Sequence, residues 1–174
     1  MSGRANVPQF QSEILCSRHR RASFSCGIDP LDDYLGRRAG QDLKKRVAAV
    51  FVLTEDGKAI AGYYTLSQFS VKLGDLPAGT VRRLPRYPQV PATLMGRPAV
   101  DRRYQGKGVG ELLLMDALRR CLAASREIAS AAVVVDAKDS RSSAFYRKYG
   151  FLDLPAIPNR LFLPMKTIEQ LLAE

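Results

Sequence analysis

The stretch that decides the fold is residues 101–110, Asp-Arg-Arg-Tyr-Gln-Gly-Lys-Gly-Val-Gly. It follows a predicted strand and leads into a predicted helix that begins near Gly108. Glycine lacks a Cβ atom, and the first backbone N–H groups of a helix point outward at the positive end of the helix dipole. The stretch therefore predicts a turn that cradles an anion such as a pyrophosphate, with Arg102, Arg103 or Lys107 neutralising the remaining charge.

Two common phosphate-binding turns do not fit this stretch. The Walker A pattern needs Gly-Lys followed by Ser or Thr, but Lys107 is followed by Gly108. A dinucleotide-binding turn needs Gly or Ala three residues after its second glycine, and Glu111 stands there instead. The remaining alternative without a ligand is an ordinary strand-to-helix connection in which the glycines only make the turn tight.

Working outward from the turn, hydrophobic periodicity predicts an α/β protein built on one mixed sheet. The predicted elements are a helix over 29–46 with Asp29 as N-cap, a hairpin of strands 47–54 and 59–67, an exposed irregular segment 74–91, a strand 92–100, a helix 108–124, a buried strand 131–137, a short helix capped by Asp139 or Ser140 and ending at Gly150, a strand 161–166 and a closing helix 167–174. Pro98 cannot donate to a strand ladder, which argues for an edge position or a local bulge there.

The composition indicates one globular domain spanning residues 1–174. The chain is 46% hydrophobic and 25% charged, and charges interrupt the apolar runs before they could cross a bilayer. The N-terminus carries no export signal, so we expect a cytoplasmic protein without a membrane partner. A net charge of +10 favours a polyanionic partner, although solubility is the plainer explanation of such charge.

The chain offers little for metal or histidine chemistry. Its three cysteines, Cys16, Cys26 and Cys121, have no C-x-x-C spacing, and His19 is the single histidine. A four-ligand zinc site therefore cannot be assembled, and we expect no metal. The cysteines are expected to be reduced and packed, and His19 to be a solvated residue in a basic run.

Two motifs resemble the acyl-CoA signature of the GNAT family of N-acetyltransferases. They are Gln105-x-x-Gly108-x-Gly110, after a strand ending Ala99-Val100, and Ala144-Phe145-Tyr146-x-x-x-Gly150-Phe151. The resemblance implies a mixed sheet with splayed central strands and acetyl-CoA as the acetyl donor. It implies Tyr146 as the general acid that protonates the leaving thiolate. It also implies the following cofactor-binding residues: Ala99, Val100, Arg103, Gln105, Gly106, Lys107, Gly108, Val109, Gly110 and Ser143.

Further motifs resemble a narrower group, the tRNA-acetylating toxins of type II toxin–antitoxin modules of the TacT and AtaT kind. They are Phe24-Ser25-Cys26-Gly27, Leu31-Asp32-Asp33-Tyr34-Leu35, Gly62-Tyr63-Tyr64-Thr65-Leu66, Arg83-Leu84-Pro85-Arg86-Tyr87-Pro88, Val100-Asp101 and Leu161-Phe162-Leu163-Pro164-Met165, within a resemblance that covers about residues 10–172. Pro98 departs from the group, whose members usually carry Leu there.

This resemblance implies acetylation of the α-amino group of aminoacyl-tRNA, which blocks translation. It also implies a homodimer and a ribbon-helix-helix antitoxin, with DNA bound only through that antitoxin in a repressor complex. The candidate tRNA-binding residues are Arg37, Arg38, Lys44, Lys45, Arg82, Arg83, Arg86 and Arg97. Two alternatives stay open: a GNAT enzyme that acetylates a small-molecule or protein amine, and a non-catalytic nucleic-acid-binding protein. No convincing general base is present, and Asp136 is a weak candidate whose plainer role is in capping or a turn.

Overall fold

The computed structural model describes residues 9–174, which divide into two compact units. One unit runs up to Thr65 and includes Arg97–Leu114, and the other holds Leu66–Gly96 and Met115–Glu174. The expectation of a single acetyltransferase domain over 1–174 stays a prediction, and residues 1–8 lie outside the described part.

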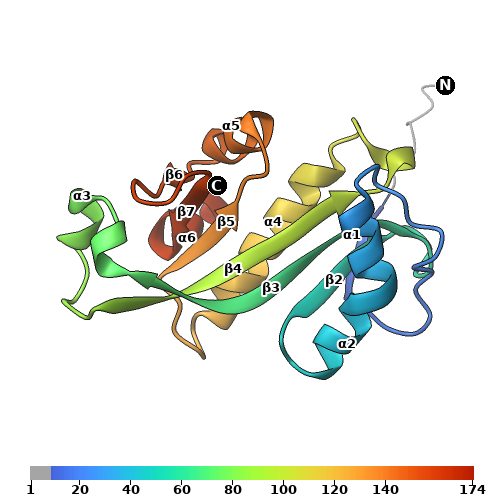
Figure 1. Cartoon of the computed structure of the whole chain (residues 1–174), viewed down its shortest axis with the longest axis horizontal. Helices are drawn as coiled ribbons and strands as arrows, with labels where there is room; N and C mark the ends of the chain where they lie inside the picture. Colours follow the sequence, from blue (N-terminus) through green and yellow to red (C-terminus); the bar gives the residue numbers. More distant parts are fainter. Residues whose placement is uncertain (1–8) are drawn as a thin grey trace. The chain divides into compact units, whose positions relative to one another are not determined.

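Within residues 9–174, seven strands are interspersed with helical elements. Figure 1 shows their arrangement. The strands are β1 (Gln11–Ile14), β2 (Ala49–Thr54), β3 (Ile60–Lys72), β4 (Gln89–Val100), β5 (Ala132–Asp136), β6 (Leu152–Asp153) and β7 (Arg160–Pro164). The helical elements are α1 (Asp29–Asp33), the π-helical turn η1 (Tyr34–Arg38), α2 (Ala39–Lys44), the 3₁₀ turn η2 (Leu73–Asp75), α3 (Ala78–Val81), the 3₁₀ turn η3 (Arg102–Tyr104), α4 (Val109–Ala124), α5 (Ser140–Lys148) and α6 (Met165–Ala173).

The strands form one mixed sheet in the order β1-β2-β3-β4-β5-β7-β6. Strands β4 and β5 are parallel, while β1 with β2 and β7 with both of its neighbours are antiparallel. This arrangement confirms the predicted α/β class with a single mixed sheet. None of the helices in the described part of the chain is long and apolar enough to cross a bilayer.

The first unit confirms the predicted N-terminal helix, with one correction. Helices α1, η1 and α2 follow one another without a gap and bury Leu35 and Ala39, as the apolar stripe predicts. Asp29 is not the N-cap: Ile28 holds that position in an extended conformation, and no side chain caps the helix. Pro30 still occupies the first turn, where its missing N–H costs nothing.

The hairpin between β2 and β3 is confirmed, because its turn has the expected chemistry. Gly57 takes a positive φ of 77°, and Asp56 Oδ1 accepts hydrogen bonds from the backbone N–H groups of Lys58 and Ala59. Strand β3 runs to Lys72, five residues beyond its predicted end. Strand β1 was not predicted, since three of its four residues are polar and the fourth, Ile14, is exposed, so the segment carries no clear alternation.

In the second unit, local sequence signals are confirmed most closely. Val133, Val134 and Val135 of β5 are fully buried, as the continuous apolar run predicts. Asp139 rather than Ser140 caps α5, because its Oδ1 accepts a hydrogen bond of 2.7 Å from the Ser142 N–H. The closing helix α6 begins at Met165, two residues before its predicted start.

The prediction of an exposed irregular segment at 74–91 is wrong in part. The segment contains α3, and β4 begins at Gln89. Leu76 and Val90 are buried in a hydrophobic cluster with Val71 and Phe162. Apolar anchors therefore hold this segment to its own unit.

Pro98 does not interrupt β4 or place it at an edge, since β4 lies between β3 and β5 in the sheet order. The edge prediction is therefore wrong. The expected local irregularity is present, because Arg97 has a positive φ of 51° directly before the proline. A non-glycine residue adopts this conformation only where the surrounding structure holds it there.

The prediction that His19 is solvated is wrong. Its side chain is buried, and its Nδ1 accepts a hydrogen bond of 2.9 Å from the Cys16 N–H. Burial lowers the His19 pKa, and the charges of Arg18 and Arg21 lower it further. The imidazole is therefore neutral and structural, which the basic run around it did not indicate.

The cysteines of the described residues are free, as expected. Burial raises the pKa of Cys26 to about 11 and that of Cys121 to about 12. Thiols with such values carry almost no thiolate at neutral pH, so these two are inert packing groups.

Candidate functional site

The glycine turn of the first unit, defined here as Gln105–Gly110, leaves open space beside its backbone. Gly106 and Gly108 have φ values of +75° and +81°, a conformation that favours glycine. A Cβ atom built on Gly106, Gly108 or Gly110 would meet no atom within 4 Å. The absence of side chains therefore keeps clear a space that the unit itself does not fill.

Helix α4 begins inside this turn, at Val109. Val109 is buried and fixes the start of the helix, while Gly110 occupies its first turn. The first four N–H groups of an α-helix have no partner within the helix. Lys107 lies beside them with an exposed side chain, so the chemistry of the turn fits a pyrophosphate.

Gln105 points its amide at the unit's own backbone. Its Nε2 donates hydrogen bonds of 2.9 Å to the Cys26 carbonyl and 3.0 Å to the Val100 carbonyl. The side chain thereby connects the turn to Val100 at the end of β4 and to Cys26, which lies 79 positions earlier in the chain. Its amide acts as a brace for the turn.

Asp101, which belongs to the sequence motifs but had been assigned no role, organises the start of the turn. Its buried carboxylate accepts hydrogen bonds from the Ser25 N–H at 3.1 Å, the Arg103 N–H at 2.9 Å and the Arg103 Nε at 2.9 Å. Burial alone would raise the Asp101 pKa, but these hydrogen bonds and the Arg103 charge outweigh it, so the pKa is lowered. The available signal was an acidic residue directly before a predicted turn.

Replacing Asp101 with Asn should lower the free energy of unfolding by about 2 kcal/mol at neutral pH, because charged hydrogen bonds to a buried group are lost. Because the Asp101 pKa is lower in the folded protein than in the unfolded chain, where it is ~3.9, the ionised carboxylate stabilises the folded state at pH values above ~3.9. This stabilisation is lost as the pH falls through the folded-state pKa. Urea unfolding at neutral pH and near pH ~3 should therefore give a difference between the two proteins that shrinks in acid. A difference that is the same at both pH values would contradict this account.

The remaining cofactor candidates of the first unit lie around the turn. Ala99 is buried and Val100 half-buried at the end of β4. The Arg103 side chain is 55% exposed although it pairs with Asp101, so its guanidinium still reaches solvent. The structure thus brings these residues together with the glycine turn in one unit.

Tyr146 and Ser143 belong to the second unit, on α5. Both are buried, and the Tyr146 ring packs on Phe145 and Phe151 with centroids 5.5 Å and 5.3 Å away. Burial raises the pKa of Tyr146 to about 12. The phenol is therefore protonated at neutral pH, and it can donate a proton.

Asp136 is engaged by Arg160, which disfavours it as a general base. Its two carboxylate oxygens accept hydrogen bonds of 2.7 Å and 3.0 Å from Arg160. Both oxygens are thus engaged in one ion pair with the Arg160 guanidinium. Asp136 therefore holds β5 to β7, consistent with the plainer structural role.

The eight basic candidates are all exposed, and they fall into two sets. The first unit carries Arg37, Arg38, Lys44, Lys45 and Arg97, and the second carries Arg82, Arg83 and Arg86. The Arg97 guanidinium lies 4.0 Å from the centroid of the Tyr34 ring, and the Tyr34 hydroxyl donates a 2.8 Å hydrogen bond to Asp42. A cation–π contact thus positions the Arg97 side chain, and its backbone has the positive φ described above.

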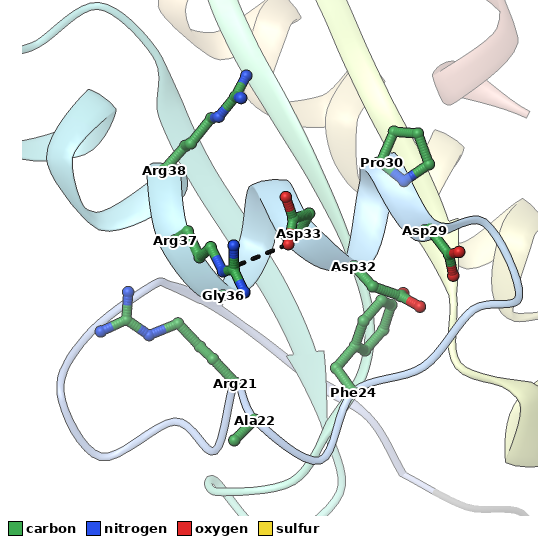
Figure 2. A pocket seen from close by; sticks show the side chains of 10 residues that line it. All are labelled: Arg21, Ala22, Phe24, Asp29, Pro30, Asp32, Asp33, Gly36, Arg37 and Arg38. Carbon is green, nitrogen blue, oxygen red and sulfur yellow. Dashed lines mark ion pairs between the residues drawn. The ribbon is translucent and has the colours of Figure 1, made fainter.

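A groove of about 1090 Å³ lies on the first unit beside α1 and η1. The Arg37 Nε lies 3.4 Å from the Asp33 Oδ1. Figure 2 shows this pair joined by a dashed line and Arg38 pointing away from it. Carboxylates and guanidinium groups both line the groove, together with Phe24 and Pro30. None of its lining residues belongs to the glycine turn.

Comparison with known proteins identifies relatives over most of the chain. A family model described as an acetyltransferase (GNAT) domain matches residues 46–152. A tRNA-acetylating toxin of Mycobacterium tuberculosis is 38% identical over 152 residues, which are 87% of this chain and 90% of that toxin.

Two solved structures are also similar. AtaT complexed with acetyl-methionyl-tRNAfMet has a TM-score of 0.88 at 27% identity, and the match covers 94% of this chain and 99% of that one. A Tyr-to-Phe mutant of AtaT, bound to the C-terminus of the antitoxin AtaR and acetyl-CoA, has a TM-score of 0.81 at 25% identity, covering 95% and 99%.

Proposed function

Because the chain belongs to the GNAT acetyltransferase family, we propose that it is the toxin of a type II toxin–antitoxin module. It transfers an acetyl group from acetyl-CoA to the α-amino group of aminoacyl-tRNA and so blocks translation. The observation that carries the enzymatic part is the open glycine turn at the start of α4. The tRNA-acetylating toxin of Mycobacterium tuberculosis, whose sequence is similar over 90% of its length, supports aminoacyl-tRNA as the acceptor.

Acetyl-CoA supplies the acetyl group as a thioester. The residues proposed to hold it are the backbone of Gly106, Gly108, Val109 and Gly110, the side chains of Arg103 and Lys107, and Ala99, Val100 and Ser143 for the pantetheine arm, with Gln105 bracing the turn. Backbone N–H groups and two cations match the charge of a pyrophosphate. Ala99 and Val100 offer the strand backbone that pantetheine amides require.

Tyr146 is the proposed general acid. It holds a proton at its hydroxyl because burial keeps its pKa far above neutral pH. As the new amide bond forms and the C–S bond breaks, Tyr146 would donate that proton to the departing sulfur, and solvent would then return a proton to the phenolate. The α-amino group titrates near ~8, so a neutral fraction is present without a general base, and water accepts its surplus proton.

The acceptor is a polyanion, which fits the net charge of +10. The proposed phosphate-binding residues are Arg37, Arg38, Lys44, Lys45, Arg82, Arg83, Arg86 and Arg97. A cationic acceptor such as a polyamine would be repelled by the same surface. This charge therefore favours tRNA over the alternative of a small basic amine.

The proposal extends to partners. We propose a cytoplasmic homodimer that a ribbon-helix-helix antitoxin neutralises, with DNA reached only through that antitoxin. The AtaT structure with the C-terminus of the antitoxin AtaR bound supports an antitoxin partner, whatever the fold of its remaining part. A gene for a small ribbon-helix-helix protein directly beside this one would support the module further.

Incubation with radiolabelled acetyl-CoA and total charged tRNA should transfer label into the RNA fraction. Label should be absent when the tRNA has been deacylated, because deacylation removes the acceptor amine. Acetyl-CoA binding without label in RNA would show that the acceptor is a small-molecule or protein amine. Failure to bind acetyl-CoA would favour a non-catalytic nucleic-acid-binding protein.

A further inference from the structure

Tyr87 is an aromatic ring that the second unit leaves in water. Its exposed fraction is 69%, and it lies in a loop between α3 and β4 that we name the arginine loop, residues 82–88. Leu84, the other large apolar residue of the loop, is half-buried. The fold therefore exposes the Tyr87 ring to solvent, whereas it partly buries Leu84.

The arginine loop has a fixed backbone. Leu73 N–H donates a 3.0 Å hydrogen bond to the Pro88 carbonyl, and Tyr87 N–H donates one of 2.9 Å to the Pro85 carbonyl. Two prolines restrict φ on either side of the ring. Leu84 packs against the hydrophobic cluster around Leu76. Binding through Tyr87 would therefore cost little ordering of the loop.

The charges around Tyr87 indicate what the ring binds. Arg82, Arg83 and Arg86 are exposed, and within residues 9–174 none of them forms an ion pair. A protein partner usually meets a contiguous apolar patch, but the exposed residues that precede and follow Tyr87 in the loop are Pro85, Arg86 and Pro88. An aromatic face flanked by free arginines is typical of sites for single-stranded nucleic acid.

We propose that Tyr87 stacks on an unpaired base at the acceptor end of the tRNA while Arg83 and Arg86 bind the neighbouring phosphates. This assignment rests on the proposed function and adds a contact to a base. A base within a duplex is already stacked on both faces, so the ring needs a nucleotide outside the paired stem. The loop would thereby recognise the single-stranded end that carries the amino acid.

The test measures binding of a fluorescent acceptor-stem RNA hairpin, with and without its unpaired 3′ nucleotides. Tyr87→Ala should weaken binding of the tailed hairpin by about 5- to 150-fold, the range for loss of one stacked base. Tyr87→Phe should bind it almost as the wild type does, because Phe keeps the ring. Neither variant should change the weaker binding of the blunt hairpin.

Two controls separate stacking from charge and from general damage. Arg86→Ala should weaken both hairpins and lower the steepness of their salt dependence, whereas Tyr87→Ala should leave that steepness unchanged. Ile128→Ala removes another exposed apolar side chain and should change nothing.

Equal losses on both hairpins, or full affinity of Tyr87→Ala for the tailed one, would overturn the stacking. Weaker binding of a protein partner with unchanged RNA binding would assign the ring to that partner and also overturn it. The proposed function fails separately, if the wild-type protein transfers no label to charged tRNA.

Discussion

Replacing Tyr146 with Phe should lower turnover by about 10²- to 10⁴-fold, the usual contribution of a positioned general acid. Phe fills the same buried space between Phe145 and Phe151, so the fold should persist. Binding of acetyl-CoA and tRNA should be unchanged, because the hydroxyl acts only as the C–S bond breaks. Single-turnover rates, with separately measured affinities, check this division between chemistry and binding.

Tyr149→Phe is the matched control, since it removes another tyrosine hydroxyl directly after the same helix and should retain turnover. The pH profile gives an independent readout. With a Tyr146 pKa of about 12, the wild-type rate should not fall through loss of the acid until the pH approaches that value. Full activity of Tyr146→Phe would remove the residue from the mechanism.

Replacing Gly110 with Val should weaken acetyl-CoA binding by about 10- to 150-fold, the cost of one lost hydrogen bond to a charged group. The new side chain would enter the open space in front of the α4 N-terminus, where the proposed pyrophosphate lies. Isothermal titration calorimetry with acetyl-CoA measures the change directly.

Gly36→Val is the matched control for Gly110→Val. Gly36 also lies in a helical segment, and a Cβ there would meet no atom within 4 Å. Both variants place a β-branched residue in a helix, so their effects on thermal stability should be similar. If both variants bind acetyl-CoA as the wild type does, the glycine turn does not hold the pyrophosphate.

Elements governed by local signals could be predicted from the sequence. The apolar stripe of α4, the valine run of β5 and the Asp139 cap depend on neighbouring residues, and all three are confirmed. Asp29 shows the limit of such signals, because an acidic residue at a helix start also fits the first turn, and Ile28 takes the cap position.

Features that depend on distant residues escaped prediction. His19 is buried in a run of basic residues that by itself favours solvent. Asp101 binds the Ser25 N–H, which is 76 positions away, so no spacing within the glycine motif reveals it. The sequence predicted the glycine turn of the site from its spacing. It did not predict the hydrogen bonds of Asp101 and Gln105 that fix the conformation of this turn.

The two hydrogen bonds from Gln105 have a consequence for ligand capture. They fix the turn through the unit's own carbonyl groups, so the conformational entropy of this segment is lost when the protein folds. A phosphate group arriving at the turn then meets N–H groups already aligned, and no rearrangement of the segment has to precede or follow the encounter. We therefore expect the association rate of acetyl-CoA to fall as the salt concentration rises, because the positive field of the protein rather than a rearrangement of the turn would govern the encounter.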